Sequence, residues 1–159
     1  MARSGEVIGL ILEGARQWSR AIETRISFTL LDAEISDGDL AGNQLPLVPE
    51  RTIRLDGNYR FNPALLVSME IIAVDDQVFG GDFTNELEKL ESYEVVNAHV
   101  SYEYKNWVLG LRVNNLLDEE YSEIGNLFTD FSNFPATTTE PSFFPSPERN
   151  YWLSAKVSF

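Results

Sequence analysis

Residues 150–159 read NYWLSAKVSF, and this stretch alternates strictly between apolar and polar side chains. One face carries Tyr151, Leu153, Ala155, Val157 and Phe159, and the other carries Trp152, Ser154, Lys156 and Ser158. A period of two predicts a β-strand. Chain ends are usually polar and frayed, so a strand that is apolar on one side and ends in Phe requires an apolar environment beside it.

Six further segments alternate in the same way, within residues 6–15, 20–35, 51–61, 64–74, 95–105 and 106–115. In the second of them, Ile22, Ile26 and Phe28 face one side, while Glu23 and Arg25 face the other. None of these segments keeps a helical period for long. The sequence therefore predicts an all-β protein of about seven antiparallel strands.

The composition excludes several classes of protein. The 12 Lys and Arg residues against 25 Asp and Glu residues give a net charge of −13, which argues against nucleic-acid binding and against a basic membrane anchor. Zero cysteines exclude disulfides, thiolate zinc sites and cysteine nucleophiles.

No stretch approaches the roughly 18 to 20 apolar residues of a transmembrane helix, but a membrane strand needs only about 9 to 11 alternating residues. Because the run VIGLIL is too short for a signal peptide, we expect the polypeptide to begin upstream of Met1.

The connections between the predicted strands differ in length in a regular way. The segments RQWSR, RFNPA and YKNW are tight turns, whereas the stretches near residues 34–50, 75–93 and 117–148 are long, acidic and rich in turn-forming residues. Antiparallel neighbours reverse direction, so all short turns lie at one end of the sheet and all long loops at the other. This asymmetry is typical of an outer-membrane barrel with short periplasmic turns and long extracellular loops.

Aromatic residues collect at the short-turn ends of the predicted strands, on their apolar faces. They are Tyr59, Phe61, Tyr102, Tyr104 and Trp107, and Phe159 belongs to the same set. Such a belt is typical of a membrane interface. The pattern therefore predicts that the apolar strand faces meet lipid and that the polar faces line a lumen.

Four segments together resemble the C-terminal barrel of TonB-dependent outer-membrane receptors. They are GNQLPLVPERTIRLDGNYRF (42–61), LESYEVVNAHVSYEY (90–104), LRVNNLLDEEY (111–121) followed by Gly125, and FFPSPERNYWLSAKVSF (143–159). The resemblance implies that residues 1–159 are the C-terminal portion of a larger barrel of about 22 strands, with the plug domain, the TonB box and the early strands absent from this sequence. It also implies that the barrel-assembly machinery reads the last strand, through Tyr151, Leu153, Val157 and Phe159.

The same resemblance implies a function. We expect a receptor in the cell outer membrane, in contact with lipid, that takes up a metal-chelate or vitamin ligand such as a ferric siderophore or a corrinoid, and that is energised by the TonB complex through the missing N-terminal part. It implies no enzymatic activity and no cofactor. The candidate ligand-binding residues are aromatic side chains of the long loops: Phe79, Phe83, Phe128, Phe131 and Phe134. The alternative is that these rings pack against neighbouring loops.

Other patterns favour ordinary structural roles. GGDF at Gly80–Phe83 lacks one acidic residue of a cyclase signature, and DGDLAGN from Asp37 lacks the bidentate Glu of a calcium loop. The single His99 cannot form a zinc site made of several His ligands. Arg25, Arg54 and Arg112 on polar faces either hold a plug by ion pairs or are solvated charges. Two rival folds stay open, namely a self-contained eight-stranded outer-membrane barrel and a soluble β-sandwich or lipocalin.

Overall fold

The computed structural model describes residues 4–132 and 138–158, and these residues form β-strands, turns and loops. The strands are β1 (Gly5–Gln17), β2 (Ile22–Ile35), β3 (Arg51–Asn62), β4 (Leu65–Val74), β5 (Tyr93–Tyr104), β6 (Trp107–Asn114), β7 (Ser122–Asp130), β8 (Thr138–Pro145) and β9 (Asn150–Val157). Within these described ranges, no helix is long and apolar enough to cross a membrane.

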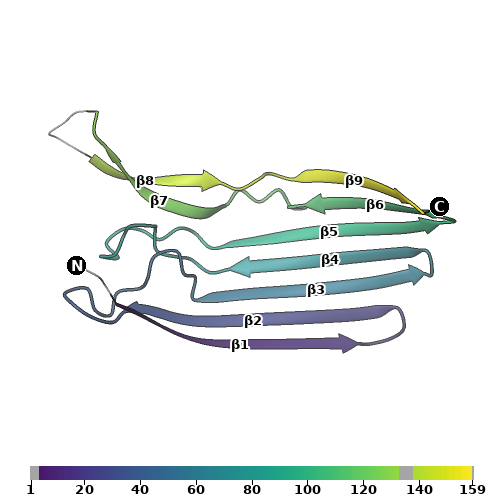
Figure 1. Cartoon of the computed structure of the whole chain (residues 1–159), viewed down its shortest axis with the longest axis horizontal. Coiled ribbons are helices and arrows are strands. Elements are labelled where there is room, and N and C mark those ends of the chain that lie inside the picture. Colours follow the sequence, from purple (N-terminus) through teal and green to yellow (C-terminus); the bar gives the residue numbers. More distant parts are fainter. Residues whose placement is uncertain (1–3, 133–137, 159) are drawn as a thin grey trace.

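Seven strands form one antiparallel sheet in the order β1-β2-β3-β4-β5-β6-β9, and β7 pairs with β8 in a separate hairpin (Figure 1). The seven strands of the sheet are the seven that the sequence predicts. In the described part of the chain β1 pairs only with β2, and β9 pairs only with β6. The sheet is therefore open at both edges within the described residues. It is a single layer, which excludes the two packed layers of a β-sandwich.

The register of the sheet separates apolar and polar side chains onto opposite faces. One row across β2 to β5 is apolar and consists of Ile26, Leu55, Ile71 and Val96. The next row, on the opposite face, is polar and consists of Arg25, Asp56, Glu70 and Asn97. Because a shift of one residue would exchange the two faces, this pattern fixes the register. We call the face that carries Arg25 the lumenal face, and the other face the outer face.

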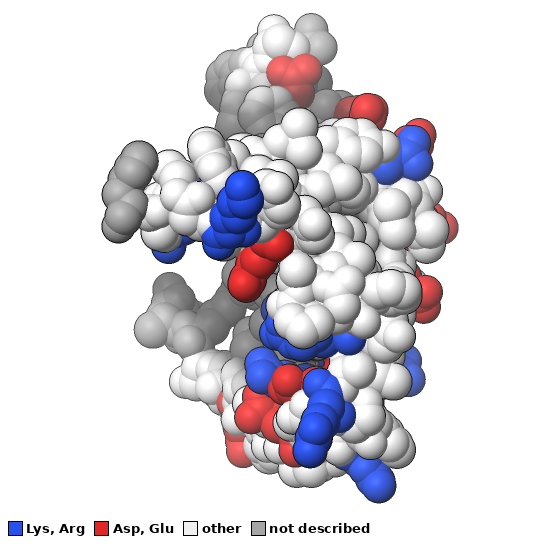
Figure 2. All heavy atoms as spheres, turned by 90° about the vertical axis from the view of Figure 1, so that its right-hand side faces the viewer, with Lys and Arg blue, Asp and Glu red and all other residues white. Residues whose placement is uncertain are grey.

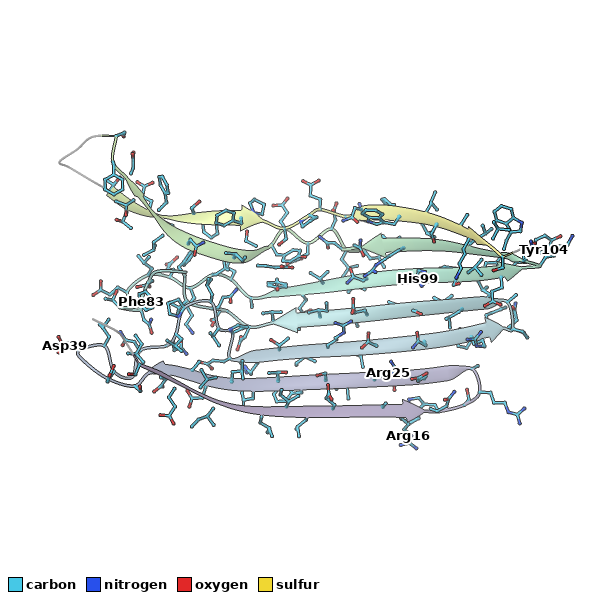
Figure 3. The ribbon with its side chains drawn as sticks, viewed as in Figure 1. Arg16, Arg25, Asp39, Phe83, His99 and Tyr104 are labelled. Carbon is cyan, nitrogen blue, oxygen red and sulfur yellow. The ribbon has the colours of Figure 1, made fainter. Side chains whose placement is uncertain are left out.

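Short turns and long loops lie at opposite ends of the sheet. Arg16 and Tyr104 lie at the short-turn end, and Asp39 and Phe83 lie at the long-loop end (Figure 3). The predicted aromatic belt lies at the short-turn end, where Tyr59 and Phe61 pack edge to face with their ring centroids 6.0 Å apart. From this end, Lys, Arg, Asp and Glu side chains appear in small groups separated by uncharged surface (Figure 2).

The buried apolar residues collect at the long-loop end. They are Ala33, Ile35, Val78, Phe79, Leu90 and Val95. The register places Ala33, Ile35 and Val95 on the lumenal face, and the other three come from the loop that joins β4 to β5. The long loops therefore fold over the lumenal face and form the only compact core in the described residues.

Candidate functional site

The loop between β2 and β3 is joined to the loop between β4 and β5 by hydrogen bonds. Asn43 Nδ2 donates to the Phe83 carbonyl over 2.9 Å, and Leu47 N–H donates to the Val78 carbonyl over 2.9 Å. The Asn85 side chain pairs with the backbone of Gln44: its Oδ1 accepts from Gln44 N–H over 2.7 Å and its Nδ2 donates to the Gln44 carbonyl over 3.2 Å. These bonds fasten the two loops to each other.

The segment Gly80–Phe83 shapes the second of these loops. A Cβ on Gly80 would overlap the side chain of Asn126, and Gly81 has a φ of +91°, which favours glycine. Asp82 is 3% exposed, and its carboxylate accepts hydrogen bonds from the Thr84 hydroxyl and the Leu87 N–H. The GGDF string thus forms a loop, as its position between two strands predicts.

The environment of Asp82 favours its charged form. Burial alone would raise the pKa of Asp82, but the hydrogen bonds from backbone N–H groups and from the Thr84 hydroxyl outweigh burial and lower this pKa. The Asp82 carboxylate stabilises the surrounding turn by accepting these hydrogen bonds. Asp82 therefore keeps residues 82–87 in one conformation.

The hairpin β7–β8 is docked on the same loop. Gly80 N–H donates to the Gly125 carbonyl over 2.8 Å, and Leu127 N–H donates to the Gly80 carbonyl over 2.9 Å. The Phe79 ring packs edge to face against Phe143, with centroids 5.3 Å apart. A Cβ on Gly125 would overlap the Phe79 ring, so glycine permits this close approach. We call residues 36–50 and 75–92, together with the described part of 115–149, the long-loop assembly.

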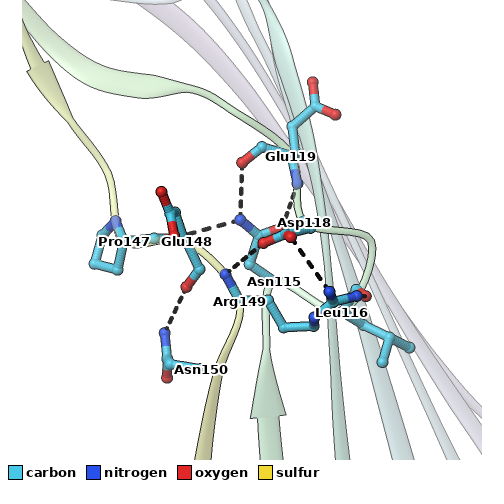
Figure 4. Close-up of polar contacts among 8 residues, drawn as sticks. All are labelled: Asn115, Leu116, Asp118, Glu119, Pro147, Glu148, Arg149 and Asn150. Carbon is cyan, nitrogen blue, oxygen red and sulfur yellow. Dashed lines mark hydrogen bonds and ion pairs between the residues drawn. The ribbon is translucent and has the colours of Figure 1, made fainter.

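Residues 115–149 are inserted between β6 and β9, and a polar cluster joins the two ends of this insertion (Figure 4). Asn115 is 2% exposed, and its side chain donates to the carbonyls of Glu119 and Pro147 and accepts from Glu119 N–H. Asp118 accepts from Arg149 through both the backbone N–H, over 2.9 Å, and the guanidinium, over 3.2 Å. These bonds join the end of β6 to the start of β9. We call Asn115, Asp118 and Arg149 the clip.

A cavity of about 900 Å³ lies between the loop 75–92 and the β7–β8 region. Its apolar lining includes Phe79, Leu90 and Phe143, and several glutamates lie along it, among them Glu88 and Glu119. This volume lies within the range of small-molecule binding sites. The described residues contain no group of three or more His, Cys, Asp or Glu side chains that could hold a metal ion.

The structure separates the predicted ligand-binding aromatics into different environments. Phe79 is 4% exposed and belongs to the core of the long-loop assembly, which matches the packing alternative for this ring. Phe83 is half-buried. Phe128 and Phe131 are 64% and 66% exposed. Phe134 lies outside the described residues. Ligand contact by these rings stays a prediction.

The residues of the predicted assembly signal lie on β9 and just after it. Tyr151 and Leu153 are 64% and 85% exposed on the outer face, and Val157 is half-buried at the end of the strand. Phe159 lies outside the described residues. Recognition by the assembly machinery stays a prediction.

The structure also shows the surroundings of Asp37 and His99, the two residues considered above as possible cation ligands. Asp37 accepts hydrogen bonds from the backbone N–H and the hydroxyl of Ser4, over 3.1 and 3.0 Å, and so ties the first long loop to the start of β1. His99 lies on β5 and lines a second cavity on the lumenal face (Figure 3). Sequence reasoning names Gly80, Asp82, Gly125 and the clip residues within longer strings but does not predict the contacts that they make.

Comparisons with known proteins agree on one architecture. Residues 6–116 match the family described as TonB dependent receptor-like, beta-barrel. The ferric yersiniabactin uptake receptor FyuA from Yersinia pestis is 18% identical, with a TM-score of 0.75 over 99% of this chain and 24% of that receptor. The ferric-catecholate import receptor Fiu from E. coli is 22% identical, with a TM-score of 0.77 over 99% of this chain and 21% of that receptor. The copper transporter OprC is 21% identical, with a TM-score of 0.72 over 98% of this chain and 24% of that transporter. The chain thus spans about a quarter of the length of these proteins.

Proposed function

Because this chain belongs to the TonB-dependent receptor-like β-barrel family, whose members lie in the outer membrane, we propose that it forms the C-terminal wall and part of the extracellular mouth of a receptor for energised nutrient uptake. The observation that carries the proposal is the joining of the long loops. All of them lie at one end of the sheet and are fastened to each other by the contacts of Gly80, Asn85 and Phe79. Joined loops above a polar lumenal face suit the capture of a ligand at the loops and its passage through the lumen.

The proposed ligand is a metal chelate, such as a ferric siderophore, or a vitamin such as a corrinoid. The similar structures are named for ferric yersiniabactin, ferric catecholate and copper, which supports a metal-bearing ligand. Phe128 and Phe131 project their rings into solvent from the hairpin region and offer an aromatic contact surface. Passage is driven by the TonB complex, which acts on a plug contributed by another part of the receptor.

Two further partners belong to the proposal. The outer face, with exposed Leu153 and Ile26, contacts membrane lipid. The closing strand β9 is recognised by the barrel-assembly machinery. The proposed role is binding and transport, with no chemical conversion of the ligand.

Uptake by iron-starved cells tests this proposal. Cells carrying the full-length receptor are offered a ferric catecholate, a ferric hydroxamate and a corrinoid, each with a radioactive metal, in the presence and absence of TonB. We expect TonB-dependent uptake of at least one of them, and a loss of that uptake when Phe128 and Phe131 are both changed to Ala.

The matched control is Phe61→Ala, because Phe61 is 66% exposed, as is Phe131, but lies at the short-turn end. Uptake should survive in this variant. Uptake that does not depend on TonB would contradict the proposed energised transport. Equal loss in both variants would remove the binding role of the hairpin rings.

A further inference from the structure

The outer face of the sheet is divided into zones by charge. Among the described residues, the carboxylates of the outer rows all lie towards the long-loop end: Glu6, Asp32, Glu34 and Glu94. Arg16 lies in an outer row at the other end of β1, and the outer positions between Glu6 and Arg16 are uncharged. At about 3.4 Å per residue, the two are about 34 Å apart along the strand. A strand tilt of about 40° reduces this to about 26 Å, the height of the apolar band of a membrane barrel. Arg16 therefore lies at the short-turn edge of the apolar band.

Arg16 stacks on an aromatic ring that is itself held in place. Its guanidinium carbon lies 4.2 Å from the centroid of the Trp18 ring. Trp18 Nε1 donates to the Thr24 hydroxyl over 2.8 Å, which keeps the indole on the outer face. The turn beyond Trp18 is fixed by Ser19, whose hydroxyl oxygen accepts from Ile22 N–H over 3.1 Å. The ring and the turn therefore hold the Arg16 guanidinium in one place.

No carboxylate of the described residues lies within ion-pair distance of Arg16, or of Arg20 in the same turn. Both arginines are exposed. The carboxylates nearest to this end of β1 and β2 are Glu13 and Glu23, which lie in lumenal rows, and Glu23 already pairs with Arg25. The turn thus holds two positive charges that the described part of the chain does not neutralise.

A second cation at the same end is held in a similar way. Lys105 lies in the turn between β5 and β6, and its Nζ is 5.3 Å from the centroid of the Tyr104 ring. Tyr104 lies in an outer row, opposite Trp107, and at the same end of the sheet as Arg16 (Figure 3). Lys105 also forms no ion pair with residues 4–132 or 138–158. Two separate turns therefore place a cation on an aromatic ring at this edge of the outer face.

A phosphodiester fits these cations best. A guanidinium binds two phosphate oxygens through parallel hydrogen bonds, and aromatic side chains favour the depth of the lipid headgroups. We propose that Arg16 and Arg20 bind the phosphate of an anionic glycerophospholipid in the leaflet at the short-turn end, and that Lys105 binds a second one. This inference rests on the proposed function, which places the outer face in lipid. An anionic headgroup is favoured over a zwitterionic one, because it has no amine of its own to neutralise the phosphate.

The test measures lipid binding to the full-length receptor purified in detergent. Native mass spectrometry counts the phosphatidylglycerol molecules that stay bound across a titration. In Arg16→Gln the affinity for phosphatidylglycerol should fall about tenfold, the loss that corresponds to a charge-assisted hydrogen bond, and Arg20→Gln in addition should lower it further. Trp18→Leu should weaken binding about threefold, because the ring orients the guanidinium through a cation–π contact. Binding of phosphatidylethanolamine should change little in these variants.

Arg60→Gln is the matched control. Arg60 lies at the same end of the sheet and also forms no ion pair with the described residues, but the register places it in a lumenal row, opposite Leu66. The affinity for phosphatidylglycerol should therefore be unchanged in this variant. An equal loss in Arg60→Gln and Arg16→Gln would mean that the lipid responds only to net charge, and would overturn the proposal.

Inorganic phosphate distinguishes a lipid site from a site for free anions. It should not displace phosphatidylglycerol, because the acyl chains of the lipid also cover the apolar outer face. Displacement by inorganic phosphate would overturn the proposal, as would an unchanged affinity in Arg16→Gln. Uptake is measured in cells that carry the same receptor. A receptor that transports but binds phosphatidylglycerol no more tightly than phosphatidylethanolamine refutes this inference alone, while one that binds phosphatidylglycerol through Arg16 but does not transport refutes the uptake function alone.

Discussion

At the scale of single residues, two glycines decide how the hairpin β7–β8 sits on the loop 75–92. Gly80 N–H donates a backbone hydrogen bond of 2.8 Å to the Gly125 carbonyl, at a point where the Phe79 ring lies against Gly125. A side chain at either position would push the two segments apart. Backbone contact between distant loops thus depends on the absence of a Cβ, which no hydrophobic pattern in the sequence reveals.

We predict that Gly125→Ala loosens the hairpin by about 1 to 3 kcal/mol, the usual cost of overpacking a close contact. Hydrogen exchange of the full-length receptor should show faster exchange in β7 and β8. The control is Gly57→Ala, because a Cβ on Gly57 meets nothing within 4 Å. Unchanged exchange in Gly125→Ala would show that the Phe79 ring can yield without cost.

Asp82 predicts a pH dependence for the long-loop assembly. Its pKa is lowered in the folded state, so its contribution to stability is present above the unfolded value of about 3.9 and is lost as the pH falls through the folded value. Asp82→Asn removes a charged acceptor of several N–H bonds and should cost about 1 to 3 kcal/mol at neutral pH.

Hydrogen exchange of residues 82–90, corrected for intrinsic rates, measures this effect. We expect the difference between Asp82→Asn and the unaltered receptor to disappear in strong acid. Glu88→Gln, an exposed change on the same loop, should have no effect at either pH. A difference that persists below the folded pKa of Asp82 would mean that shape and not charge holds the turn.

At the scale of elements, the clip shows why the strings NNLLD and PER occur where they do. They end β6 and begin β9, and their contacts hold the two ends of a long insertion together. Asn115 and Asp118 have positive φ values of 51° and 62°, which allow the chain to turn sharply out of the sheet. The first pair of β9 with β6, Asn114 with Asn150, follows directly from this closure.

Burial predicts which residue of the clip contributes more to the stability of the receptor. Asn115 is 2% exposed and its buried side chain makes three part-buried hydrogen bonds with the backbone of Glu119 and Pro147, so Asn115→Ala should destabilise the receptor by about 1 to 3 kcal/mol. The pair of Arg149 with Asp118 is partly exposed, with side-chain accessibilities of 39% and 45%. Arg149→Ala should therefore cost about 1 kcal/mol or less from the ion pair. Urea unfolding in detergent ranks the two variants, and a larger loss in Arg149→Ala would reverse the assignment.

Adjacent residues of strand β9 should differ in how much stability a new charge costs, because they lie on opposite faces. Leu153 is 85% exposed on the outer face, whereas Ser154 lines the lumenal cavity. Leu153→Arg should cost about 2 to 4 kcal/mol at the bilayer midplane, while Ser154→Arg should cost about 1 kcal/mol from repulsion by Arg112 in a wet lumen. The heat-modifiable, folded fraction in outer membranes measures both. Equal loss in the two variants would contradict the assignment of faces.

The elements differ in how well the sequence predicts them. All seven wall strands follow from alternation, because a one-layer sheet with one apolar and one polar face requires a strict period of two. The sequence does not predict the hairpin β7–β8, because Pro141 and Pro145 argue against a strand. They are tolerated in β8, which pairs on one side with β7 and has no second partner strand among the described residues. The sequence makes Phe79 a candidate ligand-binding residue because aromatics on long loops often mark recognition surfaces, with packing between loops as the alternative. The burial of Phe79 depends on Gly125, about 50 positions away in the chain, and such long-range packing has no local pattern.

At the scale of the whole molecule, the wall and the long-loop assembly are stabilised in different ways. The wall is one layer whose outer face leaves its apolar side chains exposed, while the long-loop assembly has its own protein core around Phe79 and Leu90. The two regions should therefore respond differently to solvent. We expect detergent to stabilise the wall by covering its apolar outer face. We expect the loops to keep their contacts through side-chain packing and hydrogen bonds.

The open edges of the sheet predict how residues 1–159 behave when they are produced alone. Along β1 and β9, one side of each strand has no partner among the described residues, and each unpaired backbone group costs several kcal/mol in hydrocarbon. Seven strands are also far fewer than the roughly 22 of this transporter class. We therefore expect the isolated chain, refolded in detergent, to form aggregates or edge-paired oligomers, as exposed edges generally do. Gel electrophoresis without heating, together with light scattering, distinguishes these states from a closed barrel. A compact, heat-modifiable monomer would show that β1 and β9 can pair with each other and that the wall closes without further strands.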